Sequence, residues 1–207
     1  MGRAKFTKED FYAAALAIAA GQGLAAVTVA SISARLKSPT GSFYHRFASL
    51  EVLLGELWLR AVLDFQSGMA SAQAAGDALA AALHTPAWVR KNLDQAKLLL
   101  LYDRRDFVAG EWPEQLRSRV AEMTKRMDAA SPRWARMIFG KDGREEVRLA
   151  QFLISELPVA VVRRHLERGE KPPPLVDDII RTTYAAILAD YQSRKSPARS
   201  LRRQKPV

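Results

Sequence analysis

Apolar side chains recur every three or four residues along most of the chain, and this spacing predicts an all-α fold. No segment shows the strict alternation of a β-strand, and no internal repeat is evident. Near the N-terminus, one helix is expected after Thr7 and another after Ser49, since both residues are good N-caps. We expect three short N-terminal helices to share one core, formed by Phe11, Ile18, Val29, Ile32, Leu36, Phe43 and Phe47.

The residues from 27 to 46 contain two short helices with a break between them. Thr28 can cap the first helix. A proline, Pro39, separates the first helix from the second. The residue before a proline is pushed out of the α region, whereas proline itself suits the first helical position. Ser38 is therefore predicted to cap a second helix that begins at Pro39.

This arrangement is typical of a helix-turn-helix, in which the second helix enters the major groove of DNA. Small residues, hydroxyls, an imidazole and cations face outward on it, and these groups bind phosphates and base edges. The local pattern also fits an ordinary helical hairpin with a solvated polar face. The candidate DNA-binding residues are Thr28, Lys37, Ser38, Thr40, Gly41, Ser42, Tyr44, His45 and Arg46.

The same stretch resembles the DNA-binding module of the tetracycline-repressor (TetR) family. The resemblance rests on Gly23, the Thr28-Val29 pair, the run Gly-Ser-Phe-Tyr-His-Arg-Phe at 41–47 and Ser49, and it covers about the first fifty residues. Three positions depart from the family pattern, which has an apolar residue, a cap serine and often a lysine at the positions of Ser38, Pro39 and Leu50. The resemblance implies a DNA-binding head, at about residues 1–60, followed by a helical ligand-binding and dimerisation domain at 61–193.

Prolines are expected to divide the helices of this second domain. A helix should restart at Pro86, and Ser131-Pro132 should open a short one. A longer helix over 143–168 should kink or break at Pro158, before a last helix over 176–191.

The last two helices are apolar over a wide arc, which requires partners on two sides. In the resembled family the two final helices pair with those of a second subunit. The alternative is that both helices are internal to a large monomeric core. The candidate dimer-interface residues are Ile154, Leu157, Val161, Ile180, Tyr184 and Ile187.

The net charge of +10 is concentrated at the two ends of the chain. Residues 1–47 hold six basic and two acidic side chains, and residues 194–207 hold six basic and none acidic, whereas 48–193 hold twenty of each. This division is expected of a basic DNA-binding head on a neutral body. The basic arm at 1–6 and the tail at 194–207 are predicted to be disordered, and the tail is either only solvated or adds non-specific attraction to DNA.

Composition argues against several other classes of protein. The chain has no cysteine, which excludes disulfides and favours the cytoplasm, and no apolar run approaches the ~20 residues of a membrane span. The three histidines lie in unrelated segments, and no phosphate-binding glycine loop or activated serine is present. We therefore expect neither an enzyme nor a cofactor or metal.

The resemblance implies a homodimeric transcription regulator, most simply a repressor, which binds a roughly palindromic operator in double-stranded DNA. It also implies a pocket for a small apolar or aromatic effector. The aromatic candidates for this pocket, each of which is alternatively a core residue, are Trp88, Tyr102, Phe107, Trp112 and Phe152. Two other classes stay open, a helical protein that binds small molecules and a non-specific nucleic-acid-binding protein.

Overall fold

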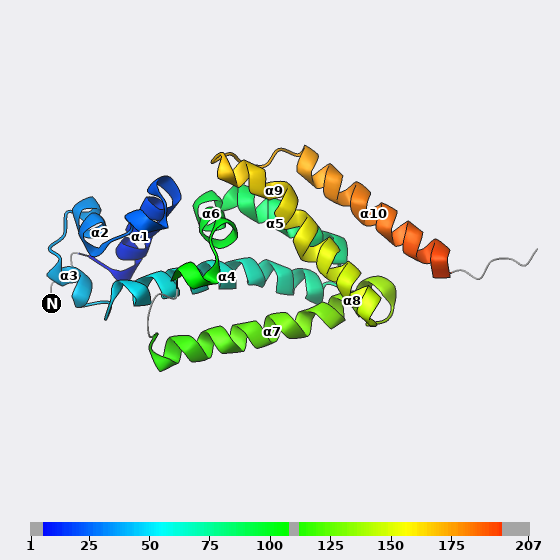
Figure 1. Cartoon of the computed structure of the whole chain (residues 1–207), viewed down its shortest axis with the longest axis horizontal. Coiled ribbons are helices and arrows are strands. Elements are labelled where there is room, and N and C mark those ends of the chain that lie inside the picture. Colours follow the sequence, from blue (N-terminus) through cyan, green and yellow to red (C-terminus); the bar gives the residue numbers. More distant parts are fainter. Residues whose placement is uncertain (1–5, 108–111, 196–207) are drawn as a thin grey trace, which may run out of the picture.

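All regular structure in the part of the chain described by the computed structural model, residues 6–107 and 112–195, is helical (Figure 1). This confirms the predicted fold class. The elements are α1 Lys8–Gln22, η1 Leu24–Ala26, α2 Val29–Leu36, α3 Gly41–Tyr44, α4 Leu50–Ala74, α5 Ala78–Lys91, α6 Leu93–Leu101, η2 Arg104–Phe107, α7 Glu114–Phe139, α8 Arg144–Gln151, η3 Phe152–Glu156, α9 Leu157–Glu167 and α10 Leu175–Lys195. Most of the predicted N-terminal arm and the tail beyond Lys195 lie outside the described residues. Arg194 and Lys195, predicted to belong to the disordered tail, instead form the last turn of α10.

Helices α1 to α3 and the start of α4 enclose the predicted N-terminal core. Its buried members are Phe11, Ile18, Ile32, Phe43 and Phe47, with Val29 and Leu36 half-buried at its edge. The Phe11 ring meets the rings of Phe43 and Phe47 edge-on, with centroids 5.9 and 6.0 Å apart. Edge-to-face rings are favourable beyond their buried area, so the aromatic cluster gives this small head a rigid centre.

Three of these helices begin at the predicted caps. The hydroxyls of Thr7, Thr28 and Ser49 each accept a hydrogen bond from the backbone N–H three residues later, at 3.0–3.3 Å. Each bond satisfies an N–H group that the first turn of a helix leaves unpaired. The helix starts in the head are therefore decided largely by local sequence.

The long helix α4 belongs to both parts of the molecule. Its first half packs in the head core through Leu53 and Leu57, and its second half runs along α7 into the body (Figure 1). It continues past Gly68 to Ala74. A Cβ at Gly68 would lie 2.1 Å from Cε1 of His84, so the glycine allows α5 to pack closely against α4.

Two of the predicted proline boundaries are wrong. Pro86 lies inside α5 and Pro132 lies inside α7, and both helices continue past them. A proline in a helix interior costs about 3 kcal/mol. Residues beyond each proline are nevertheless buried, among them Trp88 and Trp134, so tertiary packing continues the helices.

The predicted irregularity near Pro158 is present in a different form. Residues 152–156 make a single π-helical turn, η3, between α8 and α9. Pro158 cannot donate to the carbonyl of Ile154, and a wider turn before it accommodates this missing bond.

The body has a second core, formed where α5, α7, α8, η3, α9 and α10 meet. Its buried members include Trp88, Trp134, Ile154, Leu166 and Ile180. Helix α10 packs along α5 and α9, and its free end extends away from the head (Figure 1).

Polar contacts fasten α10 at both ends. At the beginning, the Arg90 guanidinium binds Asp177 at 2.9 and 3.0 Å and the carbonyls of Pro172 and Pro173. At the far end, the Tyr191 hydroxyl donates to Glu146 at 2.5 Å, and this bond lowers the pKa of that carboxyl.

Candidate nucleic-acid interface

The turn between α2 and α3 is built without the glycine that usually makes it. Lys37 has a φ of 52° in the left-handed region, which few side chains adopt. Its N–H donates to the carbonyl of Ala34 at 3.1 Å, and the N–H of Ser38 donates to Ser33 at 2.9 Å. This pair of bonds is a Schellman motif, and it ends α2 so that the chain turns sharply into α3.

The second helix begins later than predicted. It covers Gly41–Tyr44, after a turn at Pro39 and Thr40, and no side chain caps it. Ser38 is therefore not its N-cap, and the Ser38 hydroxyl is buried without a hydrogen-bond partner. The Schellman motif already uses the backbone of Ser38 to end α2, which explains the delayed start.

Two buried rings orient α3 on the head. Phe43 is 0% and Phe47 is 2% exposed, whereas Tyr44 is 59% exposed. Six of the nine candidate DNA-binding residues are exposed, namely Thr28, Lys37, Thr40, Gly41, Tyr44 and His45, while Ser38, Ser42 and Arg46 are half-buried. The polar side of α3 is thus turned to solvent because its apolar side is fixed in the core.

Arg46 is a correction to the predicted set. Its guanidinium donates to the carbonyl of Ser42 at 2.7 Å and to that of Phe6, and it lies 5.5 Å from the centroid of the Phe11 ring. These contacts turn the side chain back onto the head. Arg46 holds the segment before α1 rather than pointing outward.

The head is tied to the body through α6, a connection that the sequence did not reveal. Nζ of Lys97 donates to the carbonyl of Ala20 in the last turn of α1 at 3.1 Å. The hydroxyl of Tyr102 accepts from the N–H of Leu24 at 3.3 Å. Tyr102, predicted for the ligand pocket, therefore lies at the junction between head and body.

A second tie joins α1 to α4. The Tyr12 hydroxyl donates to Glu56, and Arg60 binds Glu9 with two bonds of 2.9 and 2.6 Å. Burial, together with Glu56, raises the pKa of Tyr12, so the phenol stays protonated and keeps donating. Both α4 and α6 thus carry polar contacts to the head.

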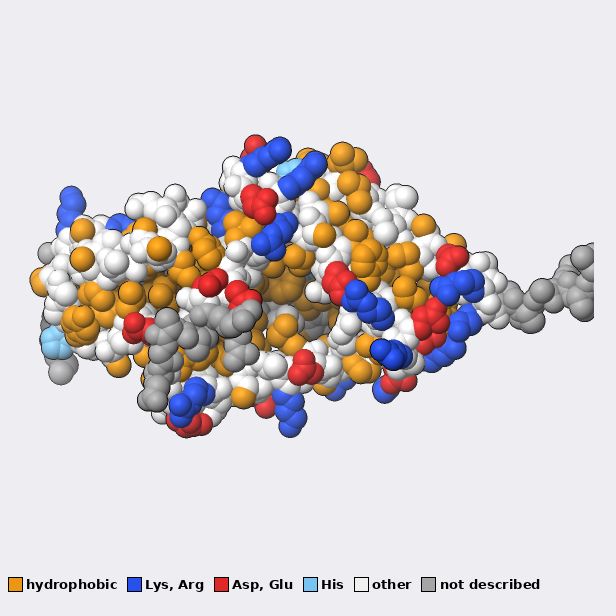
Figure 2. Space-filling model, in the orientation of Figure 1, with side chains coloured by type: hydrophobic (Ala, Val, Ile, Leu, Met, Phe, Trp, Pro, Cys, Tyr) orange, Lys and Arg blue, Asp and Glu red, His pale blue; other side chains and the backbone are white. Residues whose placement is uncertain are grey.

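The body contains an apolar hollow of about 480 Å³. Figure 2 shows hydrophobic side chains on the floor of a depression near the middle of the visible face. The hollow is lined by Trp58, Val62, Phe65, Gln66, Met69, Thr85, Leu99, Leu100, Met123, Thr124, Met127, Asp128, Ala130, Ser131, Trp134, Ala150, Gln151, Ile154, Ser155 and Val159.

None of the five predicted pocket aromatics lines this hollow. Phe107 and Trp112 are buried in the core shared with the head, and the Trp88 indole donates to Asp64 at 2.7 Å. Phe152 is half-buried in η3. The aromatic side chains at the hollow are instead Trp58, Phe65 and Trp134, and only the packing of α4 against α7 distinguishes these three from the others.

The predicted interface residues divide into two groups. Ile180 is 0% and Ile154 is 4% exposed, so both are covered by their own chain and cannot contact a second subunit. The other four, Leu157, Val161, Tyr184 and Ile187, are half-buried. The largest exposed apolar side chains of α10 are Leu175 and Ile179, which the prediction omitted.

Comparisons with known proteins agree with this arrangement. Residues 11–57 match the family described as bacterial regulatory proteins of the tetR family. A solved structure from Shewanella sp. PV-4, assigned to the tetR family of transcription regulators, has the same fold, with a TM-score of 0.58 and 17% identity over 90% of this chain and 97% of that one. No curated protein matches the chain.

A helix-turn-helix head on an all-helical body defines a DNA-binding transcriptional regulator. Its head, at residues 11–57, is a DNA-binding domain of the tetR family, which is a family of non-enzymatic regulators. Within the described residues, no cluster of ligands suits a metal ion, and no helix combines the length and apolarity needed to cross a bilayer.

Proposed function

We propose that the protein is a cytoplasmic, homodimeric repressor that leaves a roughly palindromic operator when a small apolar or aromatic ligand binds its body. Residues 1–60 would bind DNA, and residues 61–193 would bind the ligand and the second subunit. The observation that carries the proposal is the orientation of α3, since Phe43 and Phe47 are buried while Tyr44 and its polar neighbours are exposed.

In this proposal α3 lies in the major groove. Lys37, Thr28 and Ser42 would bind phosphates and set the register, while Thr40, Tyr44 and His45 would touch base edges. Gly41 supports a close approach to the backbone of DNA, because nothing lies within 4 Å of the position of its missing Cβ.

The exposed apolar side chains of α10 support dimerisation. Leu175 is 60% and Ile179 is 41% exposed, and they lie one turn apart on the same side of α10. In a dimer formed through this surface, binding to successive major grooves requires the two α3 helices to lie about 34–36 Å apart, one turn of DNA. A two-fold dimer reads a palindrome because its two heads are equivalent.

The hollow and α6 support a response to ligand. Leu99 and Leu100 of α6 line the hollow, and Lys97 and Tyr102 at the same helix contact the head. A ligand that moves α6 would therefore change the position of the head. To shift the equilibrium between the two positions of the head decisively, the ligand must bind one conformation more tightly than the other by several kcal/mol.

Selection of bound sequences from a random DNA pool, followed by gel-shift titration across a salt series, tests the proposal. A palindromic consensus and a loss of affinity in Tyr44→Ala are expected. Equal affinity for random and selected DNA would instead favour a non-specific nucleic-acid-binding protein.

The dimer needs a separate measurement. Light scattering on the wild-type chain should give twice the mass of one chain, and Ile179→Glu should lower it toward a single chain. Lys125→Glu, on an exposed position of α7, is the matched control. A wild-type chain that stays monomeric at micromolar concentration would exclude this part of the proposal.

A further inference from the structure

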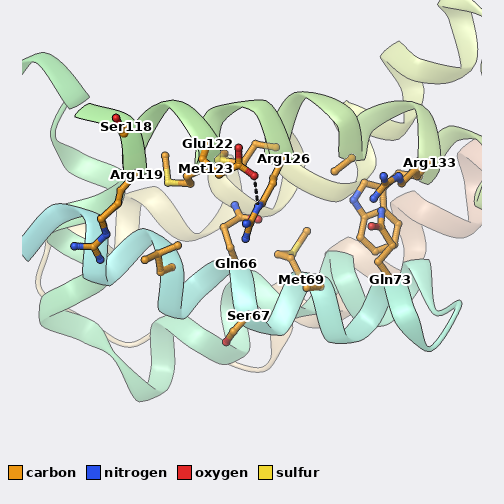
Figure 3. Close-up of a pocket in the computed structure, with 15 residues that line it drawn as sticks. Gln66, Ser67, Met69, Gln73, Ser118, Arg119, Glu122, Met123, Arg126 and Arg133 are labelled. Atoms are coloured by element: carbon orange, nitrogen blue, oxygen red, sulfur yellow. Dashed lines mark hydrogen bonds and ion pairs between the residues drawn. The ribbon is translucent and has the colours of Figure 1, made fainter. Parts of the chain in front are cut away.

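A groove runs between α4 and α7, beside the apolar hollow of about 480 Å³ described above, here called the central hollow. It has a volume of about 740 Å³. Figure 3 shows side chains of α7 on one wall and those of α4 on the other, with Gln66 and Met69 of α4 pointing toward α7. Its lining residues are Leu63, Gln66, Ser67, Met69, Ala70, Gln73, Ser118, Arg119, Glu122, Met123, Arg126, Met127, Ala130, Arg133 and Trp134.

One wall of this groove carries a row of arginines. Arg119, Arg126 and Arg133 recur every seven residues, so they lie about 10 Å apart along one side of α7. Arg126 is paired with Glu122 at 2.9 Å. In the described part of the chain, Arg119 and Arg133 have neither an ion pair nor a hydrogen bond. They lie about 20 Å apart along α7, so each end of the groove carries one uncompensated positive charge.

The opposite wall offers a further unused donor. The amide nitrogen of Gln73 is shielded from solvent and has no hydrogen-bond partner among the described residues. A buried donor without an acceptor is unfavourable, which makes it a place where a ligand oxygen gains a bond. Figure 3 shows Gln73 pointing from α4 toward the wall that carries Arg133.

The groove also adjoins the central hollow. Six residues line both, namely Gln66, Met69, Met123, Met127, Ala130 and Trp134. Three of the six are methionines, whose flexible side chains adapt to an alkyl chain. Donors and positive charge at the groove thus adjoin an apolar space between the same two helices.

We infer that this site binds an amphipathic anion, a flexible alkyl chain with a carboxylate or phosphate at one end. Its anionic group lies beside Arg133 and Gln73, at one end of the groove, and its chain passes between α4 and α7 into the central hollow. Guanidinium groups suit both head groups because they donate several hydrogen bonds to the oxygens. The inference deepens the proposed function, since it names the chemical class of the effector.

Calorimetric titration of the full chain tests the inference with three probes of equal chain length. Dodecanoate and dodecyl phosphate, used below their micelle concentrations, should bind, and dodecan-1-ol should bind roughly tenfold more weakly or worse, since charge-assisted hydrogen bonds are lost. Arg133→Gln should weaken the binding of the two anions by about as much and leave the binding of dodecan-1-ol unchanged.

The matched control is Lys125→Gln, which removes the same charge from an exposed position of α7 outside both spaces and should bind all probes like the wild type. Thermal melts establish that both variants are folded. Equal binding of anions and alcohol, no binding of either anion, or the same loss in both variants would overturn the inference.

Gel shifts with the selected operator then separate this inference from the proposed function. Selective anion binding that also weakens the operator complex supports both. Selective binding with an unchanged operator complex supports the site but removes its role as an effector site.

Discussion

The head and the body of this protein are packed in different ways. The head surrounds a cluster of phenylalanine rings that are almost completely buried, and its helices begin at side-chain caps. In the body, α4 and α7 stand far enough apart to leave spaces of about 480 and 740 Å³. A DNA-binding surface needs a fixed shape, whereas a ligand site needs space that a ligand can fill. In the proposed function, the head supplies the rigid surface that binds DNA, and the body supplies the space that a ligand fills.

The largest expected effect comes from the core of the head. Phe43→Ala should lower the free energy of unfolding by about 3–5 kcal/mol, because it removes a fully buried ring. Tyr44→Ala, at the next position but exposed, should change it by no more than about 0.5 kcal/mol. Urea unfolding of both variants measures the difference. Similar losses in the two variants would contradict the orientation given to α3.

Substitutions at two glycines test the difference between close packing in the body and open space in the head. Gly68→Ala should destabilise the protein by about 1–3 kcal/mol, since the new methyl group would collide with the His84 ring. Gly21→Ala has nothing within 4 Å of the new Cβ and should stabilise α1 by about 0.5–1 kcal/mol. Thermal denaturation reports both values. If Gly68→Ala is neutral, α4 and α5 are packed less tightly than described.

His84 should make stability depend on pH near neutrality. Burial lowers its pKa below 6.5, and its Nε2 bonds the carbonyl of Phe65 at 2.9 Å. Below pH 6.5 the unfolded chain takes up a proton that the folded chain resists, so stability should fall as the pH decreases through this value.

Unfolding measured from pH 7.5 to 5 checks this slope. His84→Gln should flatten it, and His45→Gln, which changes an exposed histidine of the head, should leave it as in the wild type. The same slope in both variants would show that His84 is not its source.

The smallest effect concerns the turn of the helix-turn-helix. Lys37→Gly should stabilise the head by roughly 1 kcal/mol, because glycine adopts the left-handed conformation without strain. It should also lower the salt dependence of DNA binding by about one phosphate contact. Lys37→Asn, which also tolerates this conformation, is the control for loss of charge alone. An unchanged salt dependence in both variants would remove Lys37 from the DNA interface.

Local sequence predicted the head well. Thr7, Thr28 and Ser49 cap helices as expected, since a cap depends on a few neighbouring residues. Phe43 and Phe47 are buried as expected, because their spacing puts them on one side of a short helix. The sequence placed the start of α3 too early, because the bond from Ser38 to the carbonyl of Ser33 is not visible in the local pattern. It also predicted that Arg46 points outward, because the contact with Phe6 is equally absent from that pattern.

The sequence by itself determined the all-helical class and a helix-turn-helix head of the tetR type, because these follow from helical periodicity, caps and one short motif. Only the tertiary structure decided that α5 and α7 continue through Pro86 and Pro132, and that Ile180 is internal. It also decided that Trp58, Phe65 and Trp134 surround the hollow, while other aromatic residues fill cores. Helical periodicity identifies an apolar face but not its neighbour, and the packing of distant helices determines whether that face meets a core, a cavity or a second subunit.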